Sequence, residues 1–338
     1  MVTSMQAVRA LQPGDPSALQ IQRVELPVLE PGTVLVRVTA AGVNRSDALA
    51  CRGVIPGRFP RTLGRDFAGV VVAGSEELAG RRVWGSGGGD LGFAIDGTHA
   101  GYVAVPEHGV SPLPPTLGDV EAAGSALAYF TAYSALTRAT GGQRADAALP
   151  VSPGDTVIIT GAAGGVGGAA AAIAHWRGAR VVGVVRNSEQ AGNVCGSTAA
   201  AHFDALVPSD SDDLPERLLS AARGATAAVD VLGGPMVAAI IPALAVSGGI
   251  CVLGGSPTQA RTTFDTLHFY RQELRLVGLH TGRLTCRDSA RILHSLAPGF
   301  ESGQLPPVPV FDVYDLEEAP TAYAQVERGV AGRPVLVP

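Results

Sequence analysis

Apolar and polar residues alternate in the first third of the chain, which is the pattern of half-buried β-strands. Residues 34–38 alternate in this way, residues 66–73 form an apolar run, and shorter runs follow at 82–84 and 102–105. Turn sequences rich in glycine and proline separate these runs. The pattern therefore predicts a β-rich region at the start of the chain.

Short apolar runs separated by helical segments replace this pattern from about residue 128 onward. Segment 166–176 is rich in small residues and predicts a helix, and buried strands are expected at 156–160, 180–185, 227–232, 250–253 and 274–279. Strand–helix alternation over this length predicts an α/β fold with a doubly wound parallel sheet. Residues 285–338 do not extend the alternation, so we expect them to return to the first domain.

The uncharged stretch 235–255 is long enough to suggest a membrane span. Pro242 and the adjacent Gly248 and Gly249 interrupt it, so we expect a buried helix followed by a buried strand instead. The N-terminus lacks the basic and then apolar pattern of a signal peptide. We therefore expect a cytoplasmic protein.

Composition excludes several kinds of chemistry. All 25 basic residues are arginine, so Schiff-base and pyridoxal phosphate chemistry, which need a lysine amine, are ruled out. A Walker A loop, which ends in Gly-Lys-Ser/Thr, is ruled out for the same reason. The four cysteines form no C-x-x-C pair and the net charge is −5, which argues against a structural zinc site and against nucleic-acid binding.

The strongest motif is the glycine-rich stretch 160–168, Thr-Gly-Ala-Ala-Gly-Gly-Val-Gly-Gly. It follows an expected strand and opens an expected helix, which is the context of a dinucleotide-binding loop. Gly164 allows the backbone to approach a pyrophosphate, and Gly167 allows the helix to pack closely on the strand. Alanine replaces the first glycine of the usual pattern. The residues expected to bind the cofactor here are Gly161, Ala162, Ala163, Gly164, Gly165, Val166 and Gly167.

The next expected strand leads into Arg186, where NAD-binding proteins have a carboxylate about 20 residues after the loop. A guanidinium binds a phosphate through two hydrogen bonds but offers no acceptor to a ribose hydroxyl. We therefore predict NADP(H), with Arg186, Asn187 and Ser188 at the 2′-phosphate. The alternative is a solvated arginine at the end of a strand.

Four motifs occur in an order that resembles one known family. They are AGVNRSDAL at 41–49, LGRDFAGVV at 63–71, AYFTAYSAL at 128–136 and the glycine-rich loop. Over nearly its whole length the chain resembles the zinc-free quinone oxidoreductase (zeta-crystallin-like) branch of the medium-chain dehydrogenase/reductase superfamily. The resemblance implies a GroES-like catalytic domain formed by residues 1–127 and 285–338, a Rossmann NADP(H)-binding domain at 128–284, an active cleft between the two domains, and a homodimer.

Zinc-dependent relatives carry a cysteine and a histidine ligand at the positions of Asn44 and Arg65. Neither an amide nor a guanidinium replaces those ligands, and the relatives' cluster of four structural cysteines is missing. The resemblance thus implies an enzyme without zinc that passes hydride from NADPH to a quinone or to the β-carbon of an α,β-unsaturated carbonyl. The alternatives are an enoyl-thioester reductase of lipid or secondary metabolism, and an NADPH-binding sensor or partner protein without activity.

The resemblance also implies roles for the catalytic candidates. Asn44 is expected to offer its amide to a substrate carbonyl, and Asp47 either orients the local backbone or transfers a proton. Arg65 binds an anionic substrate or stabilises an enolate, or else it pairs with Asp66 or another acid. Tyr129 is the nearest tyrosine that can serve as a proton donor, with a packing role as the alternative.

The remaining cofactor candidates lie in the central part of the chain. Thr131 is expected to meet the nicotinamide carboxamide, and His280 to contribute backbone to the nicotinamide pocket or to act as an acid. The other candidates follow the later strands: Leu232, Gly254, Gly255, Ser256 and Leu279. The glycine-rich loop 85–102 either covers the cleft or forms a plain turn.

Overall fold

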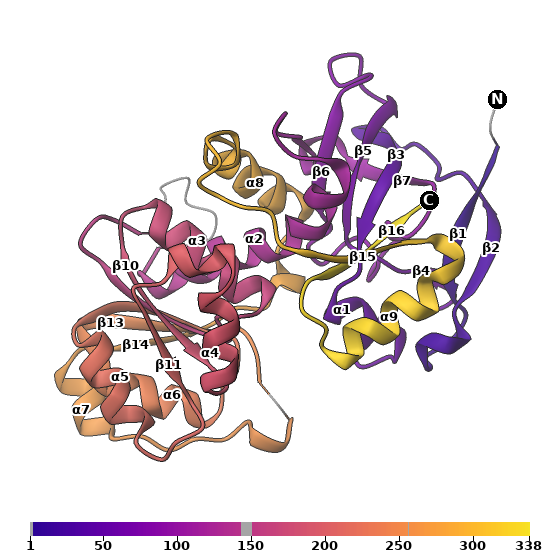
Figure 1. Ribbon diagram of the computed structural model, residues 1–338. Coiled ribbons are helices and arrows are strands. Elements are labelled where there is room, and N and C mark those ends of the chain that lie inside the picture. The colour runs from indigo at the N-terminus through magenta and orange to yellow at the C-terminus, as the bar shows by residue number, and fades with distance from the viewer. Residues whose placement is uncertain (1–2, 143–150, 256) are drawn as a thin grey trace. The chain divides into compact units, whose positions relative to one another are not determined.

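The computed structural model describes residues 3–142, 151–255 and 257–338 of the chain. The chain forms two compact units (Figure 1): the terminal unit, Met1–Phe130 with Thr281–Pro338, and the central unit, Thr131–His280. The sequence placed the domain limits at 127/128 and 284/285. The first limit falls inside helix α2 (Asp119–Ala139), where no break in the sequence marks the passage from one unit to the other.

The terminal unit is built on a sheet to which both ends of the chain contribute. In the described part of the chain its seven strands run in the order β15-β16-β3-β5-β6-β8, and β7 also pairs with β3. C-terminal strand β16 pairs antiparallel with β3, so the last residues complete a sheet that the first third begins. The bounds are β3 (Thr33–Gly42), β5 (Asp66–Ala73), β6 (Arg82–Ser86), β7 (Tyr102–Pro106), β8 (Ser111–Pro112), β15 (Val310–Asp315) and β16 (Arg333–Val337).

A smaller sheet, the first part of helix α2 and further helices complete the terminal unit. The small sheet has the order β2-β1-β4, with β1 (Ser4–Ala10), β2 (Gln20–Glu25) and β4 (Arg61–Thr62). The further helices are α1 (Arg45–Cys51), α8 (Cys286–Glu301) and α9 (Ala319–Arg328). Buried Ala48 of α1 and Tyr323 of α9 share one apolar cluster, so the C-terminal helix packs on the short helix that follows β3.

The central unit contains a parallel sheet whose strand order is β11-β10-β9-β12-β13-β14. Every pairing between neighbours is parallel. The order reverses between β9 and β12, the switch point at which doubly wound folds bind ligands at the carboxyl ends of the strands. The bounds are β9 (Thr156–Thr160), β10 (Arg180–Val185), β11 (Ala205–Pro208), β12 (Ala225–Asp230), β13 (Leu244–Val252) and β14 (Arg275–Gly278).

The helices of the central unit follow the strands in alternation: α3 (Gly165–Trp176), α4 (Ser188–Cys195), α5 (Leu214–Ala222), α6 (Pro235–Ile240) and α7 (Thr266–Arg271). The predicted α/β fold class, with a β-rich domain and a doubly wound parallel sheet, is therefore confirmed. Strand β13 begins earlier than expected, because Ser247, with a φ of 60°, and the two glycines after it interrupt the apolar pattern. Edge strand β11 was missed, since it is only four residues long and ends in proline.

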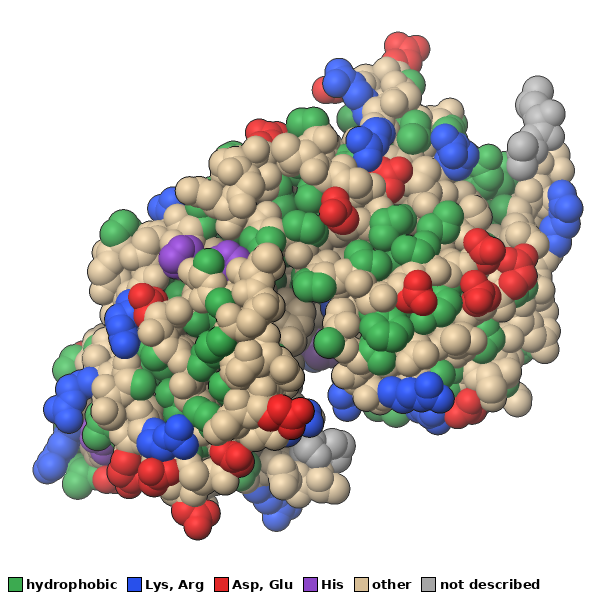
Figure 2. Space-filling model, viewed as in Figure 1, with side chains coloured by type: hydrophobic (Ala, Val, Ile, Leu, Met, Phe, Trp, Pro, Cys, Tyr) green, Lys and Arg blue, Asp and Glu red, His purple; other side chains and the backbone are tan. Residues whose placement is uncertain are grey.

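The uncharged stretch 235–255 folds as expected, with α6 followed by β13. Among the described residues, no helix has both the length and the apolar character needed to span a membrane. On the face drawn in Figure 2, acidic and basic side chains of the described residues are interspersed rather than separated by sign.

Candidate functional site

The glycine-rich loop joins β9 to α3 in the central unit. Gly161 has a φ of 60°, in the left-handed region that favours glycine, and its carbonyl accepts from the Gly164 N–H at 2.9 Å. A Cβ at Gly167 would lie 2.8 Å from the carbonyl carbon of Gly161, and closer still to the oxygen. The close approach of α3 to the loop therefore requires glycine at this position.

Packing explains why Ala162 replaces the first glycine of the usual pattern. The Ala162 N–H donates to the Val184 carbonyl at 3.1 Å, and its side chain is buried in a cluster with Val185 and Val194. The methyl group thus anchors the loop to β10. Beyond it, Ala163 and Gly164 are exposed and Gly165 and Val166 are half-buried, so the free N–H groups of the first turn of α3 can reach an anion.

Asp230, at the end of β12, organises the loop on the other side of the switch point. Its carboxylate accepts from the Thr160 hydroxyl at 2.7 Å and from the N–H groups of Leu232 and Gly233 at 3.0 Å each. Sequence reasoning missed this residue, although its position between a buried strand and a Gly-Gly pair is a usable signal. Asp230 links the end of β9 to the loop that carries the predicted residue Leu232.

The other predicted cofactor residues of the central unit lie after β13 and β14 or in α2. A Cβ at Gly254 would lie 2.8 Å from the carbonyl carbon of Val231, so the loops after β12 and β13 touch through their backbones. Gly255 and His280 are exposed, and Leu279 and Thr131 are buried. Ser256 lies outside the described residues.

Arg186 directly follows β10 and is exposed. Its backbone N–H donates to the Gln190 side chain at 2.8 Å, while its guanidinium has no hydrogen-bond or ion-pair partner within the described parts of the chain. Asn187 caps α4, since its side-chain oxygen accepts from the Gln190 N–H at 2.9 Å, a role that sequence reasoning missed. Ser188 is exposed as the first residue of that helix.

In the terminal unit, the predicted catalytic residues Asn44 and Asp47 stand at the start of α1. The Asn44 N–H donates to the Asp47 carboxylate at 2.7 Å. The Asn44 side-chain nitrogen donates to the Asp66 carboxylate at 2.9 Å, so one of its two amide hydrogens is already engaged. Both side chains are 1% exposed. Asp66, which sequence reasoning treated only as a partner for Arg65, is thus part of this site.

Two buried carboxyl groups and two arginines share this region of the terminal unit. Burial raises the pKa of Asp47 to about 6, against the opposing effect of the Arg65 and Arg333 charges. Burial also raises the pKa of Asp66 above its usual range. For Arg65 and Arg333, burial lowers the pKa and the two carboxylates oppose that shift. The opposite charges therefore counteract part of the shift that burial imposes on the pKa of each group.

Arg65 is held by uncharged groups. Its guanidinium donates to the Gly88 carbonyl and, at 3.3 Å, to the Ser46 hydroxyl. It also lies 4.8 Å from the centre of the Phe93 ring, a cation–π arrangement. Among the described residues no carboxylate is within ion-pair distance of Arg65, so a direct pair with Asp66 is not present.

Loop 85–102 supplies both Gly88 and Phe93. A Cβ at Gly88 would lie 2.9 Å from the carbonyl carbon of Leu284, and one at Gly89 would lie 2.9 Å from that of Gly282. Leu91 in the same loop is completely buried. The loop is therefore packed backbone to backbone into the terminal unit and fixes the Arg65 side chain.

Tyr129 lies in α2 with its hydroxyl donated to the Pro306 carbonyl. Its ring meets Phe300 edge to face at 4.7 Å between centroids. Burial raises the pKa of Tyr129. These contacts favour the packing role over the role of proton donor.

His99 and Tyr323 form a buried pair that sequence reasoning missed. The Tyr323 hydroxyl lies 2.9 Å from His99 Nδ1, and Nε2 lies 3.2 Å from the Gly42 carbonyl. Since a carbonyl only accepts, Nε2 carries the proton and Nδ1 accepts from the tyrosine. Burial lowers the pKa of His99 to about 4, so the ring is neutral at pH 7. No motif marks these residues, which join loop 85–102, β3 and α9.

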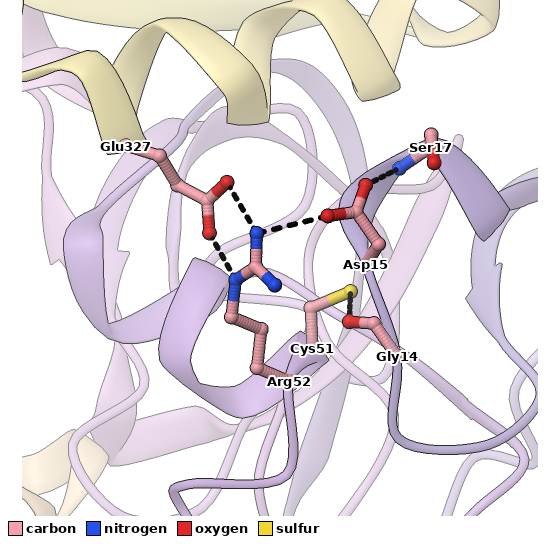
Figure 3. A network of polar contacts seen from close by, with 6 residues as sticks. All are labelled: Gly14, Asp15, Ser17, Cys51, Arg52 and Glu327. Carbon is pink, nitrogen blue, oxygen red and sulfur yellow. Dashed lines mark hydrogen bonds and ion pairs between the residues drawn. The ribbon is translucent and has the colours of Figure 1, made fainter.

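The far end of α1 is tied to two other segments, as Figure 3 shows. Arg52 donates to both carboxylate oxygens of Glu327 in α9, and its Nη2 also donates to Asp15 at 2.9 Å. The Cys51 thiol donates to the Gly14 carbonyl at 3.6 Å. The helix that carries Asn44 and Asp47 is thus anchored at its C-terminal end.

Comparisons with known proteins identify the family. The alcohol dehydrogenase GroES-like domain matches residues 30–115, and the zinc-binding dehydrogenase domain matches residues 165–295. A zinc-type alcohol dehydrogenase-like protein of Schizosaccharomyces pombe is 31% identical over 306 residues, which cover 89% of this chain and 86% of that protein. The chain belongs to the medium-chain dehydrogenase/reductase superfamily. Members of this superfamily are oxidoreductases that bind a nicotinamide cofactor.

Within the medium-chain dehydrogenase/reductase superfamily, the chain falls in the quinone oxidoreductase branch. Human quinone oxidoreductase is 27% identical over 332 residues, 96% of this chain and 94% of that protein. The solved structure of a mycobacterial quinone oxidoreductase is 25% identical with a TM-score of 0.82, covering 99% of this chain and 100% of that one. The family expected from the sequence is therefore confirmed.

Within the described residues, no group of three or more His, Cys, Asp and Glu side chains is placed to hold a metal ion. Asn44 and Arg65 stand where zinc-dependent relatives are expected to carry their ligands. The Asn44 side chain donates an N–H to Asp66, and the Arg65 side chain donates one to the Gly88 carbonyl.

Proposed function

We propose that this chain is an NADPH-dependent reductase that transfers hydride to a quinone, or to the β-carbon of an α,β-unsaturated carbonyl, without a metal. The observation that carries the proposal is the hydrogen bonding of the Asn44 and Arg65 side chains. Both present N–H donors to protein acceptors, and a protonated guanidinium repels a divalent cation and has no lone pair to offer it. The names of the quinone oxidoreductase relatives support this class of substrate.

The choice of NADPH rests on Arg186. Its guanidinium, which has no partner among the residues that the structure describes, follows the carboxyl end of β10, in the place where a carboxylate would select NAD. Arg186 and Ser188 would hold the 2′-phosphate, and the N–H groups at the start of α3 would hold the pyrophosphate. When bound, the nicotinamide supplies the hydride.

A quinone or conjugated carbonyl needs no Lewis acid, because hydride addition spreads charge onto an oxygen through the conjugated system. The protein then has to orient the substrate and stabilise that oxygen. We assign to Asp47 the orienting role, since its carboxylate accepts the Asn44 N–H. The Arg65 guanidinium, which donates to the Gly88 carbonyl, adds positive charge to the site around Asn44 and Asp47.

Steady-state oxidation of NADPH tests the reaction. The purified protein is assayed with a panel of quinones, enones and enoyl thioesters, with and without a chelator. We expect turnover of at least one class, undiminished by the chelator. Turnover that the chelator abolishes and Zn²⁺ restores would contradict the metal-free mechanism, and no turnover with any substrate would contradict the activity.

The cofactor assignment is tested by Arg186→Ala. Loss of a charged hydrogen bond costs about 1.5–3 kcal/mol, so the affinity for NADPH should fall by about 10- to 150-fold while the affinity for NADH is unchanged. Arg223, an exposed arginine of the same unit, provides the control Arg223→Ala. Unchanged NADPH affinity in Arg186→Ala would remove the basis for choosing NADPH.

An enoyl-thioester reductase is the second candidate, because one relative favours it. The chain is 28% identical over 317 residues to a mycocerosic acid synthase-like polyketide synthase of Mycolicibacterium smegmatis, covering 92% of this chain and 14% of that protein. Polyketide chains are carried as thioesters. A kcat/KM for an enoyl thioester well above that for any quinone would favour this candidate.

We also propose the homodimer that the resemblance implies. Strand β14 is the edge of the central sheet, and Leu276 on it is 43% exposed. An edge strand with an exposed apolar side chain suits pairing with a second copy. Sedimentation equilibrium should give twice the monomer mass, and a monomer at micromolar concentration would contradict the dimer.

A further inference from the structure

Two histidine side chains of the central unit lie against each other at its surface. His175 stands in the last turn of α3, and His202 ends the 3₁₀ segment Thr198–His202, which leads to β11. Their ring centres are 5.7 Å apart, and the ring planes make an angle of 62°. His175 is exposed and His202 is half-buried, so both rings can be reached from solvent.

The packing of the central unit fixes the backbone at both histidines. Ile173, two residues before His175, is completely buried. Phe203, directly after His202, packs against the apolar cluster that contains Ala162. Among the described residues, neither imidazole has a hydrogen-bond or ion-pair partner. The two rings are thus held side by side with nitrogens that no other protein group engages in that part of the chain.

The separation of the two rings suits a shared metal ion. An imidazole nitrogen binds Zn²⁺ at about 2.0–2.1 Å, which places the centre of the ring about 3.2 Å from the ion. A tetrahedral ion between two such rings therefore holds their centres about 5.2 Å apart. The observed 5.7 Å differs from this value by roughly 0.5 Å. Rotation of the exposed His175 ring about its Cβ–Cγ bond, a broad torsion, can bring a nitrogen toward His202.

We propose that His175 and His202 together bind one divalent transition-metal ion, such as Zn²⁺, with water completing its coordination. Imidazole is a ligand for Zn²⁺, Cu²⁺ and Ni²⁺, whereas Mg²⁺ prefers oxygen. A metal ion binds the neutral ring, and burial, together with the neighbouring His175, lowers the pKa of His202. The pair also stands at the C-terminal end of α3, where the partial negative charge of the helix favours a cation.

The ion links two segments that are separated along the chain by β10 and α4. Helix α3 begins at the cofactor loop, whereas segment Thr198–His202 lies between α4 and edge strand β11. Because the two rings meet only in the folded state, the ion stabilises the central unit. His175 is roughly 15 Å along α3 from the cofactor loop. The ion is therefore separate from hydride transfer, and the inference does not depend on the proposed function.

Calorimetric titration with Zn²⁺ tests the site in the wild type, His175→Ala and His202→Ala. The second ring binds an ion that the first already holds, so loss of either ring should weaken binding at the tightest Zn²⁺ site by about 100-fold. His294→Ala is the matched control, because His294 is also an exposed histidine of a helix, α8 of the terminal unit. This variant should keep the wild-type affinity.

Thermal unfolding gives a second readout. Zn²⁺ at about 100 times its Kd should raise the Tm of the wild type by roughly 5–10 °C and should leave that of the double variant His175→Ala/His202→Ala unchanged. Absence of Zn²⁺ binding by the wild type would overturn the inference. So would an affinity that neither single variant lowers, or a rise in Tm that the double variant retains, because the ion would then bind elsewhere.

Discussion

Replacing Gly167 by alanine tests the packing of α3 on the cofactor loop. The new Cβ would lie 2.8 Å from the carbonyl carbon of Gly161 and 3.1 Å from the Ala162 Cα, whereas ordinary contact begins at 3.4 Å. The atoms it meets are backbone, so no side-chain rotation relieves the clash. The helix has to move by more than roughly 0.6 Å, the difference between 3.4 and 2.8 Å, because the Gly161 oxygen lies closer still to the new Cβ.

Overpacking of this kind costs about 1–3 kcal/mol, which for a unit of this size corresponds to a fall in Tm of roughly 3–10 °C. Urea unfolding followed by circular dichroism measures the loss. NADPH affinity should fall as well, because the N–H groups at the start of α3 move away from the loop.

Gly168→Ala is the matched control, one position further along the same helix. Its Cβ would meet nothing closer than the Ala162 oxygen at 3.9 Å, and alanine is the better helix former by about 1 kcal/mol. We therefore expect Gly168→Ala to be as stable as the wild type or more so. If Gly167→Ala unfolds at the same urea concentration as Gly168→Ala, the packing argument is refuted.

Three further predictions concern the terminal unit. Tyr129→Phe leaves the Pro306 carbonyl without its donor, so stability should fall by about 1 kcal/mol with turnover retained; loss of turnover would restore the proton-donor role. His99, with its pKa lowered to about 4, contributes stability that is present above the unfolded-state pKa of about 6.5 and is lost as the pH falls toward 4. Urea unfolding between pH 7 and 4 should thus show a steeper loss for the wild type than for His99→Gln, and equal slopes would contradict this. Alanine variants of Arg52 and Glu327, whose side chains are 40% and 29% exposed, should show a coupling of about 0.5–1 kcal/mol in a double-mutant cycle, and additive effects would contradict the ion pair.

Asp47 also makes the stability of the terminal unit depend on pH, in the direction opposite to His99. Asp47 has a raised pKa of about 6, so its contribution to stability is present below its unfolded-state value of about 3.9 and is lost as the pH rises through 6. This effect runs opposite to that of His99 over the same range. It is common to the wild type and to His99→Gln, so the difference between their slopes isolates the histidine.

Local sequence patterns were sufficient for much of the central unit. Strands β9 and β10 have the limits expected from the apolar pattern, because buried parallel strands consist of uninterrupted apolar residues. The glycine at 167 was also predictable, since a residue without Cβ is needed wherever a helix starts close against a turn. Asp230 has a usable signal in its position before a Gly-Gly pair, but its partners were not predictable, because only the fold decides from which backbone N–H groups a carboxylate accepts.

The candidate site of the terminal unit depended more on tertiary structure. The sequence determined which residue types stand at positions 44 and 65, and so which ligands are missing there. It did not determine that Asn44 meets Asp66 or that Arg65 meets Gly88, residues 22 and 23 positions away.

By itself, the sequence determined the family, the fold class and the residue types available for chemistry, because each depends on local pattern. Only the tertiary structure decided the partners: Leu127 for Asp66, Gly88 for Arg65 and Pro306 for Tyr129. Each of these partners contributes a backbone N–H or carbonyl group, which nearly every residue carries. The residue type does not show which of these groups will accept or donate, so the contacts of Arg65 and of Tyr129 could be assigned only from the folded structure.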